Sequence, residues 1–367
     1  TFDKIQIYSY NKVFNFLFTS PLNYGLLQMQ NISLSNFFGF WYSYFVSFIT
    51  VESADNSLLF DLPTIIFDSF TFNGINISRH AAQFYFILDP GTMPRINCEE
   101  NLHFQISNAR LDNITLFESQ FLQSDRVFVS VSDLIASNLN LTESTLFEPS
   151  MYAVNTFFLT NSQLTGITLL GHSGIAISNI STSQGFPLEA CYDNNNVTTY
   201  ADTKPFIIYN TTFTNIGAFS KSILFGSTNP MVIIQNNTFS QITLVDSNLF
   251  EVGSYLYFLT SQSIFIQWWV GGWTYPSLPE ARVVQIFEIV ENSIFREHPG
   301  LQLLYNNIRA SIGAYEPENA VFFLNIQDNL ISFIQSIQNN GLILLKNFQI
   351  DNGTVLVKNN TFMSVLS

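Results

Sequence analysis

A short cassette that begins with Asn and ends with Phe recurs in the second half of the chain and constrains its fold more than any other feature. Clear copies of the cassette begin at Asn210, Asn236, Asn292 and Asn359, and weaker copies begin at Gln262 and Asp328. The last positions of the cassettes step by 26, 26, 30, 36 and 31 residues, at Phe213, Phe239, Phe265, Phe295, Ile331 and Phe362. A short unit that is lengthened at some repeats is typical of a solenoid.

A second cassette supports the same unit. Residues 114–121 (ITLFESQF) match residues 242–249 (ITLVDSNL) position by position in character, and residues 141–147 are a shortened form. Between the cassettes, short runs of Ile, Val, Phe, Leu and Thr end in Asn, Ser, Asp or Gly, which is the pattern of strands and turns. Helical periodicity is nearly absent.

These patterns predict an all-β chain, a parallel β-helix with loop insertions and about three strands per coil. Phe, Ile and Leu would form stacked inward columns, and corner Asn residues, which tolerate a left-handed backbone, would form side-chain ladders. We expect residues 1–367 to form a single elongated β-helix of about 13 coils, roughly 60 Å long, within a longer chain. The repeats are clearest over residues 105–367.

The cassettes NNTF, ENSIF, SNLF and ESQF resemble the repeats of pectin-lyase-like proteins, which are right-handed parallel β-helices. More narrowly, they resemble the large, Asn- and Phe-rich surface proteins of unicellular eukaryotes that carry such repeats. The resemblance covers most of the chain. It implies the right-handed fold but no activity, because the cassettes are degenerate.

The resemblance allows a test for an enzyme, because pectin-lyase-like proteins include lyases and glycoside hydrolases. Hydrolases of the fold resemble one another in Asn-x-Asp, Asp-Asp, Gly-His-Gly and Arg-x-Lys motifs, and here only Gly171-His172-Ser173-Gly174 half matches. Lyases of the fold use an Arg base beside calcium-binding Asp residues, and no Arg of this chain has a local Asp cluster. We therefore expect no catalytic residue and no cofactor.

Metal-ligand patterns are weak as well. The His residues are scattered at His80, His103, His172 and His298 and form no His-x-x-x-His pair. Glu99, Glu100 and His103 could make a weak site, although solvated loop residues are the simpler interpretation. Residues 288–298 contain three Glu and one His that could hold Ca²⁺, but no EF-hand or Asp-x-Asp pattern supports this. We expect no metal site.

Composition excludes several partners. Charged residues are 11% of the chain and the net charge is −14, so it cannot build the basic face that nucleic acid requires, and anionic membranes would repel it. Two uncharged stretches, residues 36–51 and 253–279, are interrupted by Ser, Tyr, Gln and Gly. We interpret them as strands buried on one face and expect no membrane span.

Ten Asn-x-Ser/Thr sequons favour a secreted glycoprotein, extracellular or at the cell surface, whose glycans supply the solubility that charges do not. For any single sequon the alternative is an unmodified turn Asn. The ten positions are Asn31, Asn76, Asn113, Asn140, Asn179, Asn196, Asn210, Asn236, Asn352 and Asn359.

The two cysteines, Cys98 and Cys191, form a disulfide or remain two buried thiols, and the sequence does not decide between these. They lie in two polar insertions, residues 89–101 and 184–204. We expect both insertions to project from one side of the rod.

A third insertion contains an aromatic cluster. Three of the four Trp residues lie within six positions, and the cluster consists of Trp268, Trp269, Trp273 and Tyr275. Exposed rings of this kind contact a neighbouring subunit or stack on sugars. The third interpretation is a loop that folds back over its own coil.

Together these features favour a structural protein, a rod segment of an extracellular filament or surface coat that self-associates or joins related surface proteins. The first alternative is an adhesin-like module that binds glycans, and the second is a polysaccharide lyase or hydrolase.

Overall fold

The computed structural model describes residues 2–8, 11–18, 26–51, 64–89, 102–124, 127–150, 156–178, 192–193, 196–197, 205–227, 231–253, 322–337, 343–346 and 353–366. Within these ranges the regular structure is entirely β, and no helix occurs. Three long parallel sheets, which we name A, B and C, contain all strands except one short antiparallel pair, β20 (Tyr192–Asp193) and β21 (Asn196–Val197). The predicted all-β class is therefore confirmed for these residues.

Sheet A has 12 strands: β1 (Phe2–Asp3), β2 (Gln6–Tyr8), β5 (Ser33–Ser35), β6 (Phe38–Phe40), β9 (Thr71–Ser78), β12 (Arg110–Phe117), β15 (Ile135–Thr142), β18 (Gln163–Leu170), β23 (Thr212–Phe219), β26 (Thr238–Val245), β29 (Leu330–Ile337) and β32 (Thr361–Leu366). Sheet B has nine: β3 (Lys12–Phe18), β7 (Tyr44–Val51), β10 (Ala82–Asp89), β13 (Gln120–Ser124), β16 (Thr145–Ser150), β19 (Gly174–Ser178), β24 (Ile223–Ser227), β27 (Asn248–Gly253) and β30 (Ile343–Lys346). Sheet C also has nine: β4 (Leu26–Gln30), β8 (Thr64–Asp68), β11 (Leu102–Ser107), β14 (Val127–Ser132), β17 (Phe157–Thr160), β22 (Pro205–Tyr209), β25 (Met231–Gln235), β28 (Phe322–Gln327) and β31 (Gly353–Lys358).

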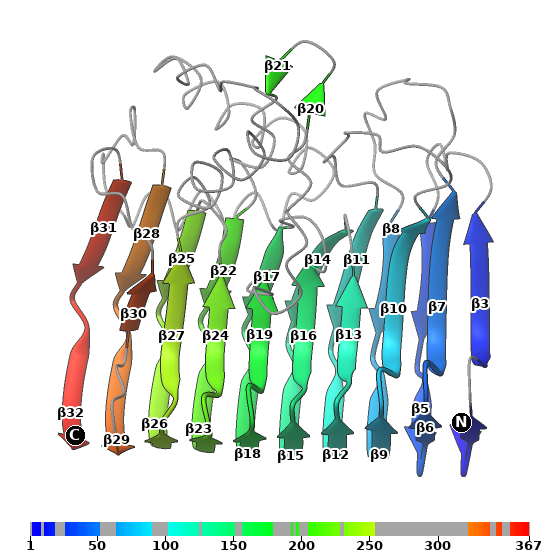
Figure 1. The fold of residues 1–367 in the computed structure, drawn as a ribbon, viewed down its shortest axis with the longest axis horizontal. Helices are drawn as coiled ribbons and strands as arrows, with labels where there is room; N and C mark the ends of the chain where they lie inside the picture. The colour runs from blue at the N-terminus through cyan, green and yellow to red at the C-terminus, as the bar shows by residue number, and fades with distance from the viewer. Residues whose placement is uncertain are drawn as a thin grey trace, which may run out of the picture.

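The chain visits the three sheets in a fixed order, A, then B, then C, before it returns to A. We call one such passage a circuit. The path through sheet A from β1 to β32 has ten positions and sheets B and C have nine strands each, so the described residues make nine complete circuits and begin a tenth with β32, not the expected 13 or so. Each strand pairs in parallel with its equivalents in the neighbouring circuits, and the strands stand side by side along the long axis (Figure 1).

Of the five predicted steps, two are correct and the three between Phe239 and Ile331 are wrong. Phe213 pairs with Phe239, and Ile331 pairs with Phe362, as the cassettes predict. Phe239, however, pairs directly with Ile331, so no circuit that contains Phe265 or Phe295 lies between them. The cassettes at those two positions lie outside the described residues, and residues 254–321 are a connection between sheets B and C.

The first cassette is the corner between sheets C and A. Each of these corners has two residues, of which the first has a left-handed backbone and the second turns inward. Asn tolerates this backbone better than other non-Gly residues do, which explains its frequency here. The left-handed residues are Asn31, Ser69, Asn108, Asp133, Asn161, Asn210, Asn236, Asp328 and Asn359.

The inward residues of the last three C-to-A corners form an asparagine ladder. Asn237 donates from its backbone N–H and its Nδ2 to Asn329 Oδ1, over 2.9 and 3.1 Å. Asn329 donates in the same way to Asn360 Oδ1, over 3.1 and 2.9 Å. Because Asn237 and Asn329 are buried, these bonds satisfy backbone amides that water cannot reach.

The second cassette is the corner between sheets A and B. Glu118, Glu143 and Asp246 have left-handed backbones, and the Ser that follows each of them is buried. The Ser119 and Ser144 amides donate to the hydroxyl of the next Ser in the column, each over 3.1 Å. Gly171-His172-Ser173 is a longer form of this corner, with two left-handed residues before the buried Ser.

Inward side chains from all three sheets form one continuous apolar core. The expected ring stacks exist between Phe213 and Phe239, whose centroids are 5.0 Å apart, and between Phe225 and Phe250, at 5.8 Å. Other rings meet edge to face across sheets, as Phe67 does with Phe84 at 4.9 Å. The interior is therefore filled by rings from different sheets as well as by stacked columns.

Candidate functional site

Every sequon Asn whose exposure the structure describes is exposed. Asn31, Asn210, Asn236 and Asn359 lie at C-to-A corners, Asn113 lies at a left-handed kink within β12, and Asn76 and Asn140 lie on the outer face of sheet A. Asn196 lies in β21, and Asn179 and Asn352 lie outside the described residues. The seven exposed sequons therefore share sheet A and the corner that leads into it.

Three of these Asn side chains also contact the neighbouring circuit. Asn113 Nδ2 donates to Asn73 Oδ1 over 2.9 Å, and Asn210 Nδ2 donates to Asn161 Oδ1 over 2.8 Å. Asn236 Nδ2 donates to the Tyr209 hydroxyl oxygen over 3.1 Å. An amide nitrogen carries two protons, so the bonds of Asn210 and Asn236 each leave one proton position for other chemistry. Asn113 Nδ2, in contrast, also donates to Asp112 Oδ2 over 3.0 Å.

The three insertions singled out in the sequence leave the sheets at one edge. The connections between sheets A and B have two or three residues in the first eight circuits, and all C-to-A corners have two. The long connections all run from sheet B to sheet C, and they include residues 90–101, 179–204 and 254–321. In Figure 1 the ends of the sheet B strands lie along the upper edge of the view. The expectation that the insertions leave from one side is confirmed for their anchor strands.

The predicted aromatic cluster of Trp268, Trp269, Trp273 and Tyr275, and both cysteines, Cys98 and Cys191, lie in these connections and outside the described residues. The same holds for Glu99, Glu100 and the acidic patch at residues 288–298. The predicted contact loop and the disulfide therefore stay predictions.

His103 is not the solvated loop residue that the sequence suggested. It lies in β11 and is fully buried, with its Nε2 2.8 Å from Ser130 Oγ and its ring stacked on Phe128 at 4.3 Å between centroids. It points outward from sheet C, as do Phe158, Ile207 and Ile233 in the neighbouring register column, which are buried too. Part of sheet C is therefore buried on both faces. Among the described residues no group of three His, Cys, Asp or Glu could hold a metal ion.

At three places an Asp carboxylate accepts hydrogen bonds from a Ser and an Asn of the next circuit, and we call this arrangement the Asp device. Asp112 Oδ1 accepts hydrogen bonds from Ser137 Oγ at 2.7 Å and Asn138 Nδ2 at 2.9 Å, both on the next circuit. Asp3 and Asp68 make the same pair of bonds. These bonds favour the charged form, so they lower the pKa of each carboxyl, with Asn36 the largest cause at Asp3, Asn108 at Asp68 and Ser137 at Asp112.

Glu148 is the one acid of the described residues with a raised pKa. It lies in β16 beside Gln123, and although its side chain is partly exposed, its Oε2 is buried without a hydrogen-bond partner. Burial disfavours the charged carboxylate and raises the pKa of Glu148 to about 7.

The structure shows a surface that the sequence analysis missed, the aromatic strip of Tyr8, Phe38, Phe40 and Trp41. Residues 36–51 were expected to form strands buried on one face, and Phe37 and Phe45 are indeed buried. Tyr8 and Trp41, however, are 52% and 47% exposed. The available signal was Gly39, which occupies an inward position between two outward Phe residues, where an added Cβ would lie tightly, 3.0 Å from the Phe37 ring and 3.1 Å from Ser43 Oγ.

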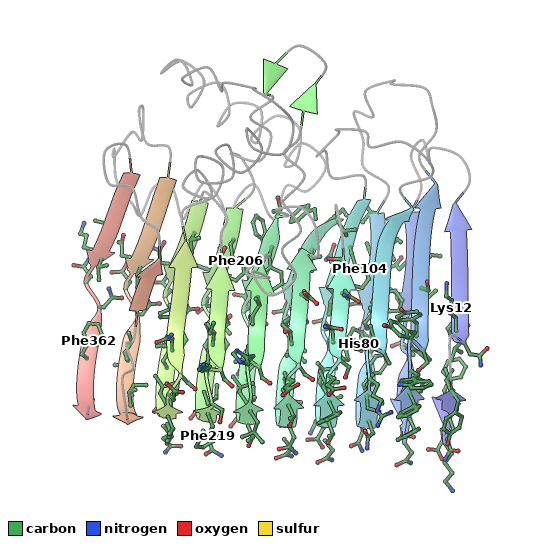
Figure 2. All side chains as sticks on the ribbon, in the orientation of Figure 1. Lys12, His80, Phe104, Phe206, Phe219 and Phe362 are labelled. Atoms are coloured by element: carbon green, nitrogen blue, oxygen red, sulfur yellow. The ribbon has the colours of Figure 1, made fainter. Side chains whose placement is uncertain are left out.

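The last strands expose residues that are buried in earlier circuits. Phe362 lies in the same inward column as Phe239 and Ile331, which are 0% and 1% exposed, but it is itself 49% exposed (Figure 2). Val357 and Met363 nearby are also exposed. This surface presents an unpaired strand edge together with apolar side chains.

Comparison of the chain with models of known protein families, with curated proteins and with solved structures yields no match. The resemblance to pectin-lyase-like proteins therefore rests on the cassettes alone. No helix in the described ranges is long and apolar enough to span a membrane.

Proposed function

We propose that this chain is a secreted, N-glycosylated structural protein, a right-handed parallel β-helix that forms a rod segment of an extracellular filament or surface coat. One observation carries the proposal: the order A, B, C repeats through ten positions of sheet A, with each strand in parallel register with the next. Such stacking gives a rod whose length depends only on the number of circuits.

Self-association has two candidate contacts. A further circuit, from the same polypeptide or from a second copy, can stack on β31 and β32 and cover Phe362, Val357 and Met363. The insertion that contains Trp268 and Trp269 supplies the second contact, at the edge between sheets B and C. Aromatic side chains are frequent anchors of protein interfaces.

The distribution of sequons supports the same arrangement. The seven exposed sequon Asn residues lie on sheet A or its leading corner, whereas the long insertions leave at the opposite transition, from sheet B to sheet C. Glycans on the sheet A side would keep that face in solvent while the insertion edge contacts other molecules.

The test is electron microscopy and sedimentation of the chain secreted from a glycosylating host, over a range of concentrations. We expect a regular polymer that grows with concentration and is weakened by Trp268→Ala with Trp269→Ala. Trp41→Ala is the matched control, because Trp41 is exposed at the corner between sheets A and B, away from the insertion edge. A chain that stays monomeric throughout contradicts the proposal, and a monomer that binds a glycan array supports the adhesin-like alternative instead. An unchanged polymer in the double variant removes the Trp loop as the contact.

A further inference from the structure

One sequon lies directly beside the aromatic strip. Phe38 in β6 pairs with Asn76 in β9, and Phe40 pairs with Ser78, the third residue of the same sequon. Phe37, Gly39, Ile75 and Ile77 are all buried, so the alternating side chains of Phe38 and Asn76 both point outward from sheet A. Neighbouring strands lie about 4.8 Å apart, which places the Asn76 amide next to the Phe38 ring.

Three rings of the strip are nearly parallel, and the fourth, Tyr8, is tilted 51° from Phe38 with centroids 5.8 Å apart. Phe38 and Phe40 have centroids 6.4 Å apart with an angle of 11° between their planes, and Phe40 and Trp41 are 5.7 Å apart at 17°. The Arg79 guanidinium lies 5.2 Å from the Phe40 ring centroid and 5.9 Å from that of Trp41. The strip is thus an ordered row of ring faces with a cationic group that holds two of them in place.

The backbone keeps Trp41 on the surface against local preference. Trp41 and Tyr42 have φ angles of 52° and 50°, in the left-handed region that bulky residues disfavour. At the equivalent corner other circuits place Arg79, Gly171 or Ser220. Among these four positions Trp41 alone is aromatic, and it adds an exposed ring to the strip at a conformational cost.

We propose that an N-linked glycan on Asn76 packs its first sugars on the aromatic strip. Sugar rings have apolar C–H faces that match ring faces, and their hydroxyl groups remain in water. The covalent link to Asn76 acts as a short tether, so the glycan meets the strip at high effective concentration without a separate binding step. The contact covers apolar surface that would otherwise be open to solvent.

The attachment follows ordinary sequon chemistry. The Asn76 Nδ2 displaces the diphosphate from the anomeric carbon of a lipid-diphosphate oligosaccharide donor, so the N–C bond forms as the C–O bond to the diphosphate breaks. One amide proton is released, and the lipid diphosphate leaves. The inference therefore rests on the proposed secretion and glycosylation, although not on polymer formation.

Asn140 provides a matched comparison within the chain. It lies in the same outward column as Asn76, separated from it by Thr115, and its direct neighbours are Thr115 and Thr168. Both sequons share sheet, exposure and local backbone, but only Asn76 has an aromatic ring as its register partner. A glycan on Asn140 has no aromatic register partner on which to pack.

The experiment is a double-variant cycle on the full chain secreted with homogeneous N-glycans. Mass spectrometry should find Asn76 glycosylated. Asn76→Gln should lower the unfolding temperature by about 1–3 °C in the parent, and should have no such effect once Phe38→Ser and Phe40→Ser are present. Asn140→Gln should have the same effect in both backgrounds. If Asn76→Gln lowers the unfolding temperature by the same amount in the parent and in the protein with Phe38→Ser and Phe40→Ser, the inference is overturned. An unglycosylated Asn76 also overturns it.

A second measurement needs no substitution. In the parent chain with labelled N-acetyl groups, the acetyl methyl signal of the first sugar on Asn76 should shift upfield through the ring currents of Phe38 and Phe40. The corresponding signal on Asn140 should lie at the free-glycan position. An unshifted Asn76 signal overturns the inference. Both readouts are made on the monomer. A chain that forms no filament would therefore contradict the proposed function but would not contradict the contact between the Asn76 glycan and the aromatic strip.

Discussion

Neighbouring asparagines at one corner have different physical roles. Asn236 has a left-handed backbone and is exposed, whereas Asn237 turns inward and bonds to Asn329. The first role needs only a residue that tolerates positive φ, and the second needs both an amide donor and an acceptor. All nine C-to-A corners use the first role, whereas the amide-bonded second role occurs where an inward Asn follows, as in the last three corners.

The ladder predicts a large difference between two substitutions of Asn at these corners. Asn329→Leu should lower the free energy of unfolding by about 2–4 kcal/mol, because it leaves the buried Asn237 N–H and the Ile234 carbonyl without partners. Asn236→Gly, the control at a left-handed position, should be close to neutral, since Gly adopts positive φ without strain. Chemical denaturation of both variants measures the difference, and equal losses would contradict the ladder's role.

The Asp device predicts a loss of stability in acid. The pKa values of Asp68 and Asp112 are lowered in the folded state, so their contribution is present above the unfolded value of about 4 and is lost as pH falls through the folded values. Both carboxyls are near solvent, so each contributes about 0.5 kcal/mol or less. Chemical denaturation at a series of pH values should show that Asp112→Asn reduces the dependence of the free energy of unfolding on pH below about pH 4. If the variant has the same pH dependence as the parent, the Asp112 carboxyl does not contribute to the loss of stability in acid.

Glu148 predicts a pH effect of the opposite sign. Its pKa rises from 4.5 to about 7 on folding, so the folded state holds a proton that the unfolded state has released in this window. Stability therefore falls as pH rises from 4.5 to 7. The free energy of unfolding of Glu148→Gln should exceed that of the parent by about 1–3 kcal/mol at pH 8, and the two values should converge near pH 4.5. Parallel curves for the two proteins would show that the carboxyl is solvated.

At the scale of elements, the sequence predicts the corners well because they are local. Glu118-Ser119 and Asp246-Ser247 share a left-handed first residue and a buried Ser, as their similarity indicates. The sequence cannot predict whether a segment with corner-like residues joins the stack. That depends on which strands pair, and pairing joins residues far apart in sequence, such as Phe239 and Ile331.

The aromatic strip was missed for a related reason. Alternation in residues 36–40 shows that some rings point outward, but not that Asn76 lies beside them. Their sequence separation spans a whole circuit, and only the register of β6 against β9 makes them neighbours. Likewise, the burial of His103 depends on an outer face of sheet C that no local pattern marks.

The direct pairing of β25 with β28, β26 with β29 and β27 with β30 predicts that the long connection is dispensable for the fold. Replacing residues 254–321 with the three residues 228–230, which make the same transition one circuit earlier, should preserve the β spectrum and a single cooperative transition. Circular dichroism and thermal melts test this. Loss of the transition would show that the connection is part of the folding unit.

At the scale of the whole molecule, the corners differ in tolerance to length. C-to-A corners keep two residues throughout because a left-handed residue and an inward residue complete the turn. Long insertions occur only between sheets B and C, where no such column fixes the turn in the described residues, and the longest connection between sheets A and B has five residues. Variation is therefore confined to one edge, and the stacking register of the other two corners is unaffected.

Stacked circuits predict a specific diffraction signature. Strands run across the long axis and pair along it, so oriented filaments should give a reflection at about 4.8 Å along the filament axis. X-ray fibre diffraction of aligned polymer measures this. A reflection at that spacing perpendicular to the filament axis would mean that molecules assemble side by side and not end to end.

The ladders also give the rod a direction. Backbone amides of Leu134, Ser162 and Thr211 each donate to a side chain of the following circuit, as do those of Asn237 and Asn329. The serine ladder donates the same way. Each of these backbone-amide bonds therefore runs toward the carboxyl terminus, whereas the hydrogen bonds from Ser137 and Asn138 to Asp112 run the opposite way, so the two ends of the rod differ chemically. A fibre assembled tip to tail from such units would have unlike tips, and its growth and shrinkage would differ between them.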